Sequence, residues 1–315
     1  MKKKHIINLS SLILSGSLFF NMQPNIHVSK VVIPAAGFGT RMLPFTKAVP
    51  KEMLPILNKP AIQYIVEESI SSGINEIIFI TAAGKEAIAN HFDHLPLLEN
   101  FLRSKKKEQL VDEVNTLITN ATYTTIRQPE QNGLGHAVLM AQHSIDNEYF
   151  GVILPDDIIE ADIPGLQQLI TIAQQENASV IGVEEIPMEH VSRYGVITKE
   201  KQIKANAWIV SDLVEKPQPE EAPSNLAICG RYILSSKIFG ILKNTKPGAG
   251  GEIQLTDAIK TMIQAGEKVI AVKIDGSRYD LGNPKGWLEA NIAYGLHDPL
   301  YADWIKFLVN SNQNS

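Results

Sequence analysis

Short apolar runs of strand length alternate with helix-periodic segments from residue 31 onward. Residues 31–36 and 76–82 are two such runs, and residues 60–72 between them repeat apolar side chains at helical spacing before Gly73. This alternation predicts βαβ units, and therefore an α/β fold with a doubly wound, mostly parallel sheet. Ligands bind beyond the carboxyl ends of the strands in such sheets, so we expect a site in the loops that follow the strands.

The pattern continues along the chain and becomes richer in strands beyond residue 185. A charged stretch, residues 86–117, contains the basic run 103–107, which we interpret as a solvated helix face. Further strands are expected at 122–127, 150–155, 178–184, 194–198, 209–214, 226–234 and 269–274, and further helices at 134–143, 165–176, 252–265 and 286–295.

Charge and cysteine content exclude several classes of protein. The 315 residues include 29 Lys and Arg against 34 Asp and Glu, and without the three lysines of residues 1–21 the rest sums to −8. Such a chain is a poor nucleic-acid binder, because contact with phosphates needs a basic surface. The single cysteine, Cys229, excludes an intramolecular disulfide framework and a cysteine-based metal site, and we expect it to be an inert core residue.

The first residues differ in character from the rest. Residues 1–21 are basic and then apolar, as in a secretory signal, yet no A-x-A-like cleavage site follows and Met22 comes shortly before the first strand. We favour an over-long start over export. The expected organisation is an N-terminal extension (1–29), one domain (30–300) with two parts (about 30–185 and about 186–300), and a C-terminal tail (301–315).

The loop after the first expected strand has the chemistry of an anion site. Gly37 and Gly39 let the backbone pass close to a ligand, and Arg41 and Lys51 add cations that bind phosphate oxygens. A third glycine of a dinucleotide-binding fingerprint is missing, since Met42 takes its place, and no phosphate-binding P-loop pattern occurs in the chain.

Several motifs in order resemble those of the sugar-nucleotide pyrophosphorylases, a nucleotidyltransferase family. Gly37-Phe-Gly39-Thr-Arg41 is followed by Pro-Lys51-Glu-Met-Leu-Pro, and the resemblance extends over about residues 30–295. It is strongest to the uridylyltransferases of the family. The other motifs that carry it are Arg127-Gln128, Gly133-Leu-Gly135-His136, Leu154-Pro-Asp156-Asp157, Val214-Glu215-Lys216-Pro217, Cys229-Gly230-Arg231-Tyr232 and Gly251-Glu252-Ile-Gln-Leu-Thr-Asp257.

The resemblance implies transfer of a uridylyl group from UTP to glucose 1-phosphate, with release of pyrophosphate. It assigns catalytic roles to Arg41 and Lys51 on the triphosphate and to Lys216 on the sugar phosphate. The implied nucleotide-binding residues are Ala36, Gly37, Gly39, Thr40, Gln128, Gly133 and Gly135, and the implied sugar-phosphate-binding residues are Glu215, Lys216 and Gly230.

Two carboxylates are candidates for a Mg²⁺ site. Asp156 follows the apolar strand 150–155, where a carboxylate suits Mg²⁺ together with substrate phosphates, whereas Asp157 points the other way if the chain stays extended. The resemblance adds Asp280 as a second carboxylate. His91 and His94 lie at helical spacing but have no third ligand nearby in sequence, so we do not expect a metal there.

The resemblance also implies a homodimer or homotetramer. Since UTP and glucose 1-phosphate are cytosolic metabolites, we expect a cytoplasmic protein without nucleic-acid or membrane partners. Three alternatives stay open: a thymidylyltransferase or another sugar-1-phosphate enzyme, an inactive nucleotide-binding regulator, and an exported binding protein that rests on residues 1–21 alone.

Overall fold

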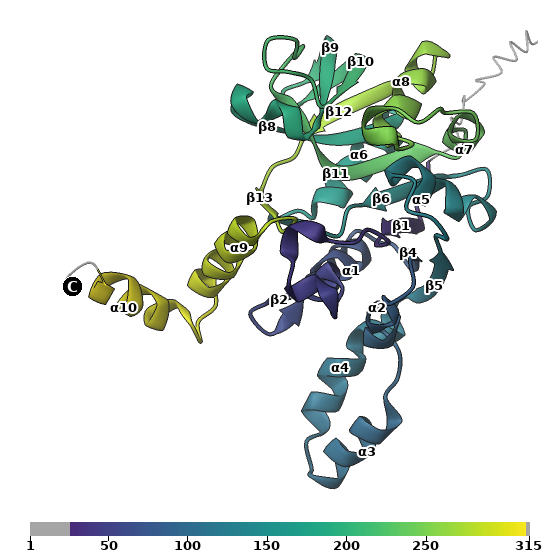
Figure 1. Cartoon of the computed structure of the whole chain (residues 1–315). Coiled ribbons are helices and arrows are strands. Elements are labelled where there is room, and N and C mark those ends of the chain that lie inside the picture. The colour runs from purple at the N-terminus through teal and green to yellow at the C-terminus, as the bar shows by residue number, and fades with distance from the viewer. Residues whose placement is uncertain (1–25, 313–315) are drawn as a thin grey trace, which may run out of the picture.

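A nine-stranded mixed sheet forms the centre of the molecule. The computed structural model describes residues 26–312. The sheet has the order β5-β4-β1-β6-β11-β8-β12-β10-β9 (Figure 1). The bounds of its strands are β1 Lys30–Pro34, β4 Glu76–Thr81, β5 Thr122–Arg127, β6 Tyr149–Ile153, β8 Ser179–Glu185, β9 Gly195–Lys204, β10 Ala207–Glu215, β11 Leu226–Ser235 and β12 Val269–Lys273.

Helices cover both faces of this sheet, which confirms the expected doubly wound α/β fold. Helices α1 (Ala61–Ser71) and α6 (Gly165–Glu176) pack on one face, and α5 (Leu134–Met140), α7 (Ile238–Leu242) and α8 (Leu255–Gln264) pack on the other. Successive strand residues feed opposite layers: Val31 and Ile33 join the α1/α6 layer, whereas Val32 joins the α5/α8 layer. A strand covered on both faces reads as a continuous apolar run for this reason.

The direction of the strands divides the sheet into two regions. The pairs β5–β4, β4–β1 and β1–β6 are parallel, whereas β11 runs antiparallel to both of its neighbours, β6 and β8. The β8–β12 pair is parallel again, and β10 pairs antiparallel with β12 and β9. All ten residues of β11 are buried. The first region is therefore a parallel sheet, and the second is a strand-rich, largely antiparallel extension of it.

Two short ribbons flank the large sheet. Strand β7 (Asp157–Glu160) pairs antiparallel with β13 (Ser277–Asp280), so that Asp157 lies opposite Asp280. Strands β2 (Pro55–Ile56) and β3 (Lys59–Pro60) form the second ribbon, just before α1. The β7–β13 ribbon brings a segment from the end of the chain to the carboxyl end of β6.

Two helical arms project from the body (Figure 1). After the short helix α2 (Glu86–His91), the charged stretch forms a hairpin of α3 (Pro96–Ser104) and α4 (Glu108–Asn120), with the basic run exposed at the turn between them. Helices α9 (Pro284–His297) and α10 (Ala302–Asn312) form the other arm, and α10 occupies most of the segment expected as a tail.

Residues 1–21, on which the choice between export and an over-long start depends, lie outside the described residues. Within residues 26–312 no helix is both long and apolar enough to cross a membrane.

Candidate active site

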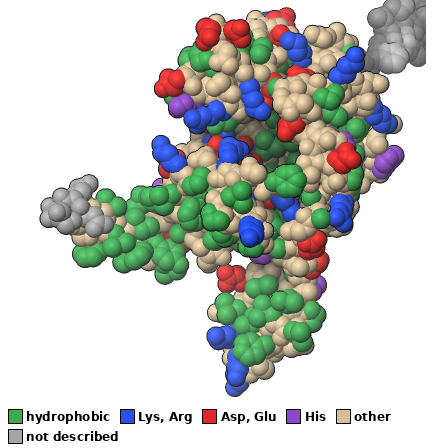
Figure 2. All heavy atoms as spheres, in the orientation of Figure 1, with side chains coloured by type: hydrophobic (Ala, Val, Ile, Leu, Met, Phe, Trp, Pro, Cys, Tyr) green, Lys and Arg blue, Asp and Glu red, His purple; other side chains and the backbone are tan. Residues whose placement is uncertain are grey.

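A cavity of about 910 Å³ opens at the carboxyl ends of the parallel strands. Figure 2 shows this part of the surface as a hollow with acidic and basic side chains around it. Residues far apart in sequence meet here because parallel strands end at the same edge of the sheet. Of the residues proposed from sequence, those that line the cavity are Ala36, Gly37, Arg41, Lys51, Gln128, Gly133, Asp156, Glu215, Lys216 and Asp280.

Gly39, Thr40, Gly135 and Gly230 do not line this cavity. Gly39 has a φ of 66°, and a Cβ there would lie 3.2 Å from Cβ of Lys51. A Cβ at Gly135 would lie 2.8 Å from the carbonyl oxygen of Ile253, inside the protein. These two glycines let neighbouring segments pack closely in the ligand-free structure, which is a packing role that the sequence reading did not include.

An ion pair joins the glycine-loop side of the cavity to the end of β6. The Nζ of Lys51 lies 2.5 Å from Oδ2 of Asp156, with both side chains largely buried. Burial opposes ionisation of Asp156, but the Lys51 ammonium outweighs it and holds the pKa of the carboxyl below its ordinary value. Burial likewise opposes the charge on Lys51, yet Asp156 raises its pKa. Both groups are therefore charged at neutral pH.

Asp156 and Asp280 converge on one small space beside Gly282. A Cβ added to Gly282 would lie 2.8 Å from Oδ1 of Asp280, 3.2 Å from Oδ2 of Asp156 and 3.0 Å from Nη2 of Arg41. Two carboxylate oxygens around a space of this size fit Mg²⁺, which takes one or two carboxylates together with phosphate oxygens. Among residues 26–312 no group of three or more His, Cys, Asp and Glu side chains is placed to hold a metal, so the remaining ligands would come from elsewhere.

The opposite wall of the cavity carries Lys216 directly after β10. Its backbone has a φ of 49°, in the left-handed region, and its side chain is 46% exposed. The Nζ lies 3.4 Å from Oε1 of Glu215. The Lys216 N–H donates to the carbonyl of Tyr194 at 3.0 Å, which extends the β9–β10 ladder by one residue. The backbone of Lys216 is therefore held by the hydrogen bond to Tyr194, whereas its half-exposed side chain has room to change conformation.

Gln128 lies buried at the end of β5, beside the start of α5. Its Nε2 lies 2.9 Å from Nδ1 of His136 and 3.4 Å from the carbonyl oxygen of Gly133. Gly133 has a φ of 101°, and a Cβ there would lie 2.7 Å from Cβ of Glu252. The side-chain amide is thus oriented by contacts within the protein at the wall of the cavity.

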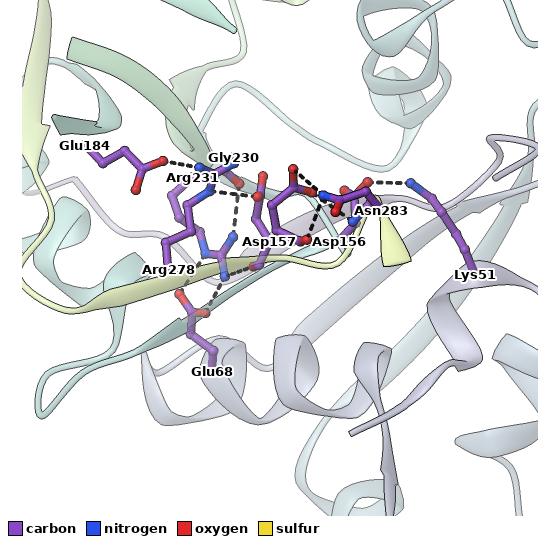
Figure 3. A network of polar contacts seen from close by, with 11 residues as sticks. Lys51, Glu68, Asp156, Asp157, Glu184, Gly230, Arg231, Arg278 and Asn283 are labelled. Carbon is purple, nitrogen blue, oxygen red and sulfur yellow. Dashed lines mark hydrogen bonds and ion pairs between the residues drawn. The ribbon is translucent and has the colours of Figure 1, made fainter. Parts of the chain in front are cut away.

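A chain of buried ion pairs runs behind the two aspartates (Figure 3). Arg278 donates from Nε to Oδ1 of Asp157 at 2.8 Å and from Nη1 to Glu184. Arg231, which is fully buried, donates to both carboxylate oxygens of Glu68 and to the Asp157 carbonyl at 2.7 Å. Burial raises the pKa of Asp157 to about 6 despite the facing Arg278. Asp157 points toward Arg278 and Asp156 toward Lys51, as alternation along an extended chain requires.

The cavity also contains residues that the sequence reading missed, namely Arg193, Tyr194, Arg278 and Lys285. A signal existed for one of them. Arg278 precedes Asp280 by two residues, so a short strand places both side chains on the same face. Arg193 ends the 3₁₀ helix Met188–Arg193, Tyr194 follows it, and Lys285 lies at the start of α9. No strand periodicity reveals which way a side chain points in these segments.

His91, His94 and Cys229 make contacts within the fold and do not line the cavity. His91 contacts Gln63 at 3.0 Å, and Nδ1 of His94 lies 3.0 Å from Glu99. Cys229 is buried in β11, where burial raises the pKa of its thiol to about 12. The interpretation of Cys229 as a core residue is confirmed.

Comparison with known proteins gives the family. The model of the nucleotidyl transferase family matches residues 30–295, which is most of the chain. The chain belongs to the nucleotidyl transferase family. Enzymes of this family generally use a divalent metal ion.

The individual proteins that this chain resembles are sugar-nucleotide enzymes of the same family. A Staphylococcus epidermidis UTP–glucose-1-phosphate uridylyltransferase is 46% identical over 282 residues, which cover 90% of this chain and 97% of the relative. The Bacillus subtilis uridylyltransferase YngB is 48% identical, with 86% and 91% covered. Similar solved structures are a UDP-glucose pyrophosphorylase complexed with UDP-glucose (TM-score 0.78, 41% identity, 86% and 100% covered) and the UTP-bound enzyme of Acinetobacter baumannii (0.83, 37%, 90% and 99%).

Proposed function

We propose that the chain transfers a uridylyl group from UTP to glucose 1-phosphate and releases pyrophosphate. The observation that carries this proposal is the meeting of Arg41, Lys51, Asp156, Glu215 and Lys216 around one cavity. The uridylyltransferase relatives match almost the full length of the domain and support the choice of substrates.

The chemistry follows from the charges. A phosphate oxygen of glucose 1-phosphate attacks the α-phosphorus of UTP in line, and pyrophosphate leaves. The attacking oxygen is already anionic, so no general base is needed, and catalysis consists of positioning two anions that repel each other. Arg41 and Lys51 hold the triphosphate, Lys216 holds the sugar phosphate, and Glu215 accepts hydrogen bonds from sugar hydroxyls.

We propose further that the divalent ion is Mg²⁺, held by Asp156 and Asp280. When bound, Mg²⁺ neutralises charge that develops on the phosphate oxygens. Lys51 pairs with Asp156 directly, so a metal ion held by Asp156 would compete with the ammonium for this carboxylate and would leave Lys51 available to the triphosphate.

The nucleotide assignment places the uracil base and ribose at Ala36, Gly37, Gln128 and Gly133. An amide side chain provides both a donor and an acceptor, as reading the edge of uracil requires. Gly39 and Gly135 let the segments around this region pack closely, and Thr40 and Gly230 stay in the proposed nucleotide and sugar-phosphate sites, respectively.

We also propose a homo-oligomer, homodimer or homotetramer, in the cytosol where both substrates occur. The α9–α10 arm presents apolar side chains to solvent, and helical arms of this kind are stabilised by packing against a partner. The exposed side chains are Leu288, Ile292, Leu296, Leu300, Trp304, Phe307, Leu308 and Val309. Light scattering of the purified protein, with Trp304→Glu and Phe307→Glu introduced together, tests this assignment.

A pyrophosphate-release assay tests the reaction itself. The purified protein is supplied with UTP, dTTP, CTP, ATP or GTP in combination with glucose 1-phosphate or galactose 1-phosphate, with and without Mg²⁺. We expect the highest rate with UTP and glucose 1-phosphate and none without a divalent ion. A preference for dTTP points to a thymidylyltransferase, and no release with any pair points to a nucleotide-binding regulator.

A further inference from the structure

Arg278 contacts three groups that belong to different parts of the site. Its guanidinium pairs with Asp157, next to the metal-binding carboxylate, and with Glu184 at the end of β8 (Figure 3). Its Cζ lies 4.9 Å from the centre of the Tyr194 ring. The guanidinium is therefore buried between the metal side of the cavity and the loop that leads into β9.

The contact with Tyr194 reaches Lys216 in one further step. The Tyr194 carbonyl accepts the N–H of Lys216 at 3.0 Å, at the point where Lys216 adopts its left-handed φ of 49°. The Lys216 side chain is half-exposed and lies 3.4 Å from Glu215, so this backbone hydrogen bond is a direct link between the turn and the loop that leads into β9. A shift of Tyr194 would therefore shift the Lys216 backbone relative to the cavity.

The other end of the chain of contacts is rigid. Arg231 donates to the Asp157 carbonyl at 2.7 Å, and the Leu281 N–H donates to the Asp156 carbonyl at 2.7 Å. The backbone at the two aspartates is thus held from both sides. The ion pair with Asp157 holds the Arg278 guanidinium against this backbone. The guanidinium in turn packs against the Tyr194 ring and so restricts where the Tyr194 loop can lie.

Arg278 also offsets the negative charge of Asp157. Asp157 adjoins Asp156, and an unpaired carboxylate there would repel the anionic substrates of the proposed reaction. A guanidinium has the planar shape and number of donors to satisfy two carboxylates and lie against a ring at once, which an ammonium group does not.

We infer that Arg278 is a positioning residue that holds the Lys216 turn in register with the metal-binding carboxylates, and so sets affinity for the sugar phosphate. The inference rests on the proposed function, because Lys216 is the residue assigned to that phosphate. It adds a residue from β13 that lines the cavity, and whose guanidinium is engaged by Asp157, Glu184 and the Tyr194 ring.

The experiment compares a ligand that fills both subsites with one that fills only the nucleotide side. Calorimetry gives the dissociation constants of UDP-glucose and UTP for the full chain and for Arg278→Met and Arg278→Lys. We expect Arg278→Met to weaken UDP-glucose binding by about 10–100-fold and to change UTP binding by less than about 3-fold. Arg278→Lys recovers part of the loss, because an ammonium pairs with one carboxylate only.

Steady-state kinetics gives a second readout. The KM for glucose 1-phosphate rises more than kcat falls, and the KM for UTP stays within about 3-fold. Lys273→Met is the matched control, since it breaks the exposed ion pair between Lys273 in β12 and Glu185 in the adjacent strand β8 and leaves both constants unchanged. Two results overturn the inference. One is an equal rise in KM for UTP and for glucose 1-phosphate, and the other is normal UDP-glucose binding by a folded Arg278→Met variant.

Tyr194→Leu keeps the inference testable if Arg278→Met does not fold. This variant removes the ring contact and leaves both ion pairs of Arg278 in place. It raises the KM for glucose 1-phosphate, and combined with Arg278→Lys it adds less than the sum of the two single effects. Full additivity contradicts the proposed path. If the unmodified protein binds neither UTP nor UDP-glucose, the proposed function fails instead.

Discussion

The two sides of the cavity hold their cations in different ways. Lys51, on the glycine-loop side, is paired with Asp156 at 2.5 Å and largely buried, whereas Lys216, on the proposed sugar side, is 46% exposed and lies 3.4 Å from Glu215. On the proposed nucleotide side, the cation Lys51 is therefore part of a buried ion pair that also belongs to the fold. On the proposed sugar side, a backbone turn presents the half-exposed side chain of Lys216. Substitutions on the first side should affect both stability and activity, and those on the second should affect activity alone.

The largest effect is expected on the sugar side. Lys216→Ala removes the charge that we propose contacts the substrate phosphate, and the rate of UDP-glucose formation should fall by about 10²–10³-fold, as it does when one stabilising donor is lost. Because the side chain is half-exposed, thermal unfolding and circular dichroism should not change. Near-normal turnover in a folded variant would remove Lys216 from the mechanism.

Asp156→Asn tests the nucleotide side. It takes away a metal-binding carboxylate and the partner of Lys51, so activity should fall by about 10²-fold and a higher Mg²⁺ concentration should be needed. The free energy of unfolding at pH 7 should fall by about 1–3 kcal/mol, less than for a fully buried pair. Chemical denaturation and a Mg²⁺ titration measure the two effects.

The same variant has a pH signature. Lys51 lowers the pKa of Asp156 in the folded state, so its ionisation stabilises the fold above the ordinary aspartate pKa of about 4. This stabilisation is lost as the pH falls through the lower folded-state value. The stability difference between the unmodified protein and Asp156→Asn should therefore be complete at pH 7 and shrink in acid. A difference that grows in acid would contradict the pairing.

Gly230→Ala probes the rigid support between the two sides. Gly230 has a φ of 71°, and its new Cβ would lie 2.6 Å from Oδ2 of Asp157. Both strain and the clash should lower the free energy of unfolding by about 1–3 kcal/mol. Gly240→Ala is a matched control, because nothing lies within 4 Å of a Cβ there. Denaturant melts of the two variants give the comparison, and equal stability would argue against the clash.

The smallest effect is expected at Cys229. Its thiol is buried and its pKa is raised to about 12, so it should not react with iodoacetamide in the folded protein at pH 8. Mass spectrometry should detect alkylation only after unfolding. Labelling of the native protein at the rate of a free thiol would show that β11 opens.

The sequence predicted one side of the cavity better than the other. Arg41, Lys51 and Asp156 follow strands of the parallel region, and a shared sheet edge brings such residues together. Strand β11 is buried along its whole length, with Arg231 among its residues, so no alternation of exposed and buried positions encodes that it runs antiparallel to its neighbours.

The sequence also could not predict which distant residues pair with each other in the folded protein. Arg278 is 94 residues from Glu184 and 121 from Asp157, and no local periodicity relates such distant positions. The packing roles of Gly39 and Gly135 depend equally on what lies opposite them in space. Motifs therefore predicted many of the residues that line the cavity, and the structure was needed to find those that support them.

The β7–β13 ribbon constrains how this region evolves. Arg278 and Asp280 face the cavity, whereas Tyr279 between them faces the other way, toward the ring of Tyr294 in α9. A one-residue insertion or deletion inside β13 would exchange these faces, turning a phenol toward the metal-binding carboxylate and a guanidinium into an aromatic cluster. We therefore expect length variation in related chains to be confined to the turns on either side of the ribbon, while Arg278, Tyr279 and Asp280 of this four-residue strand keep their alternation.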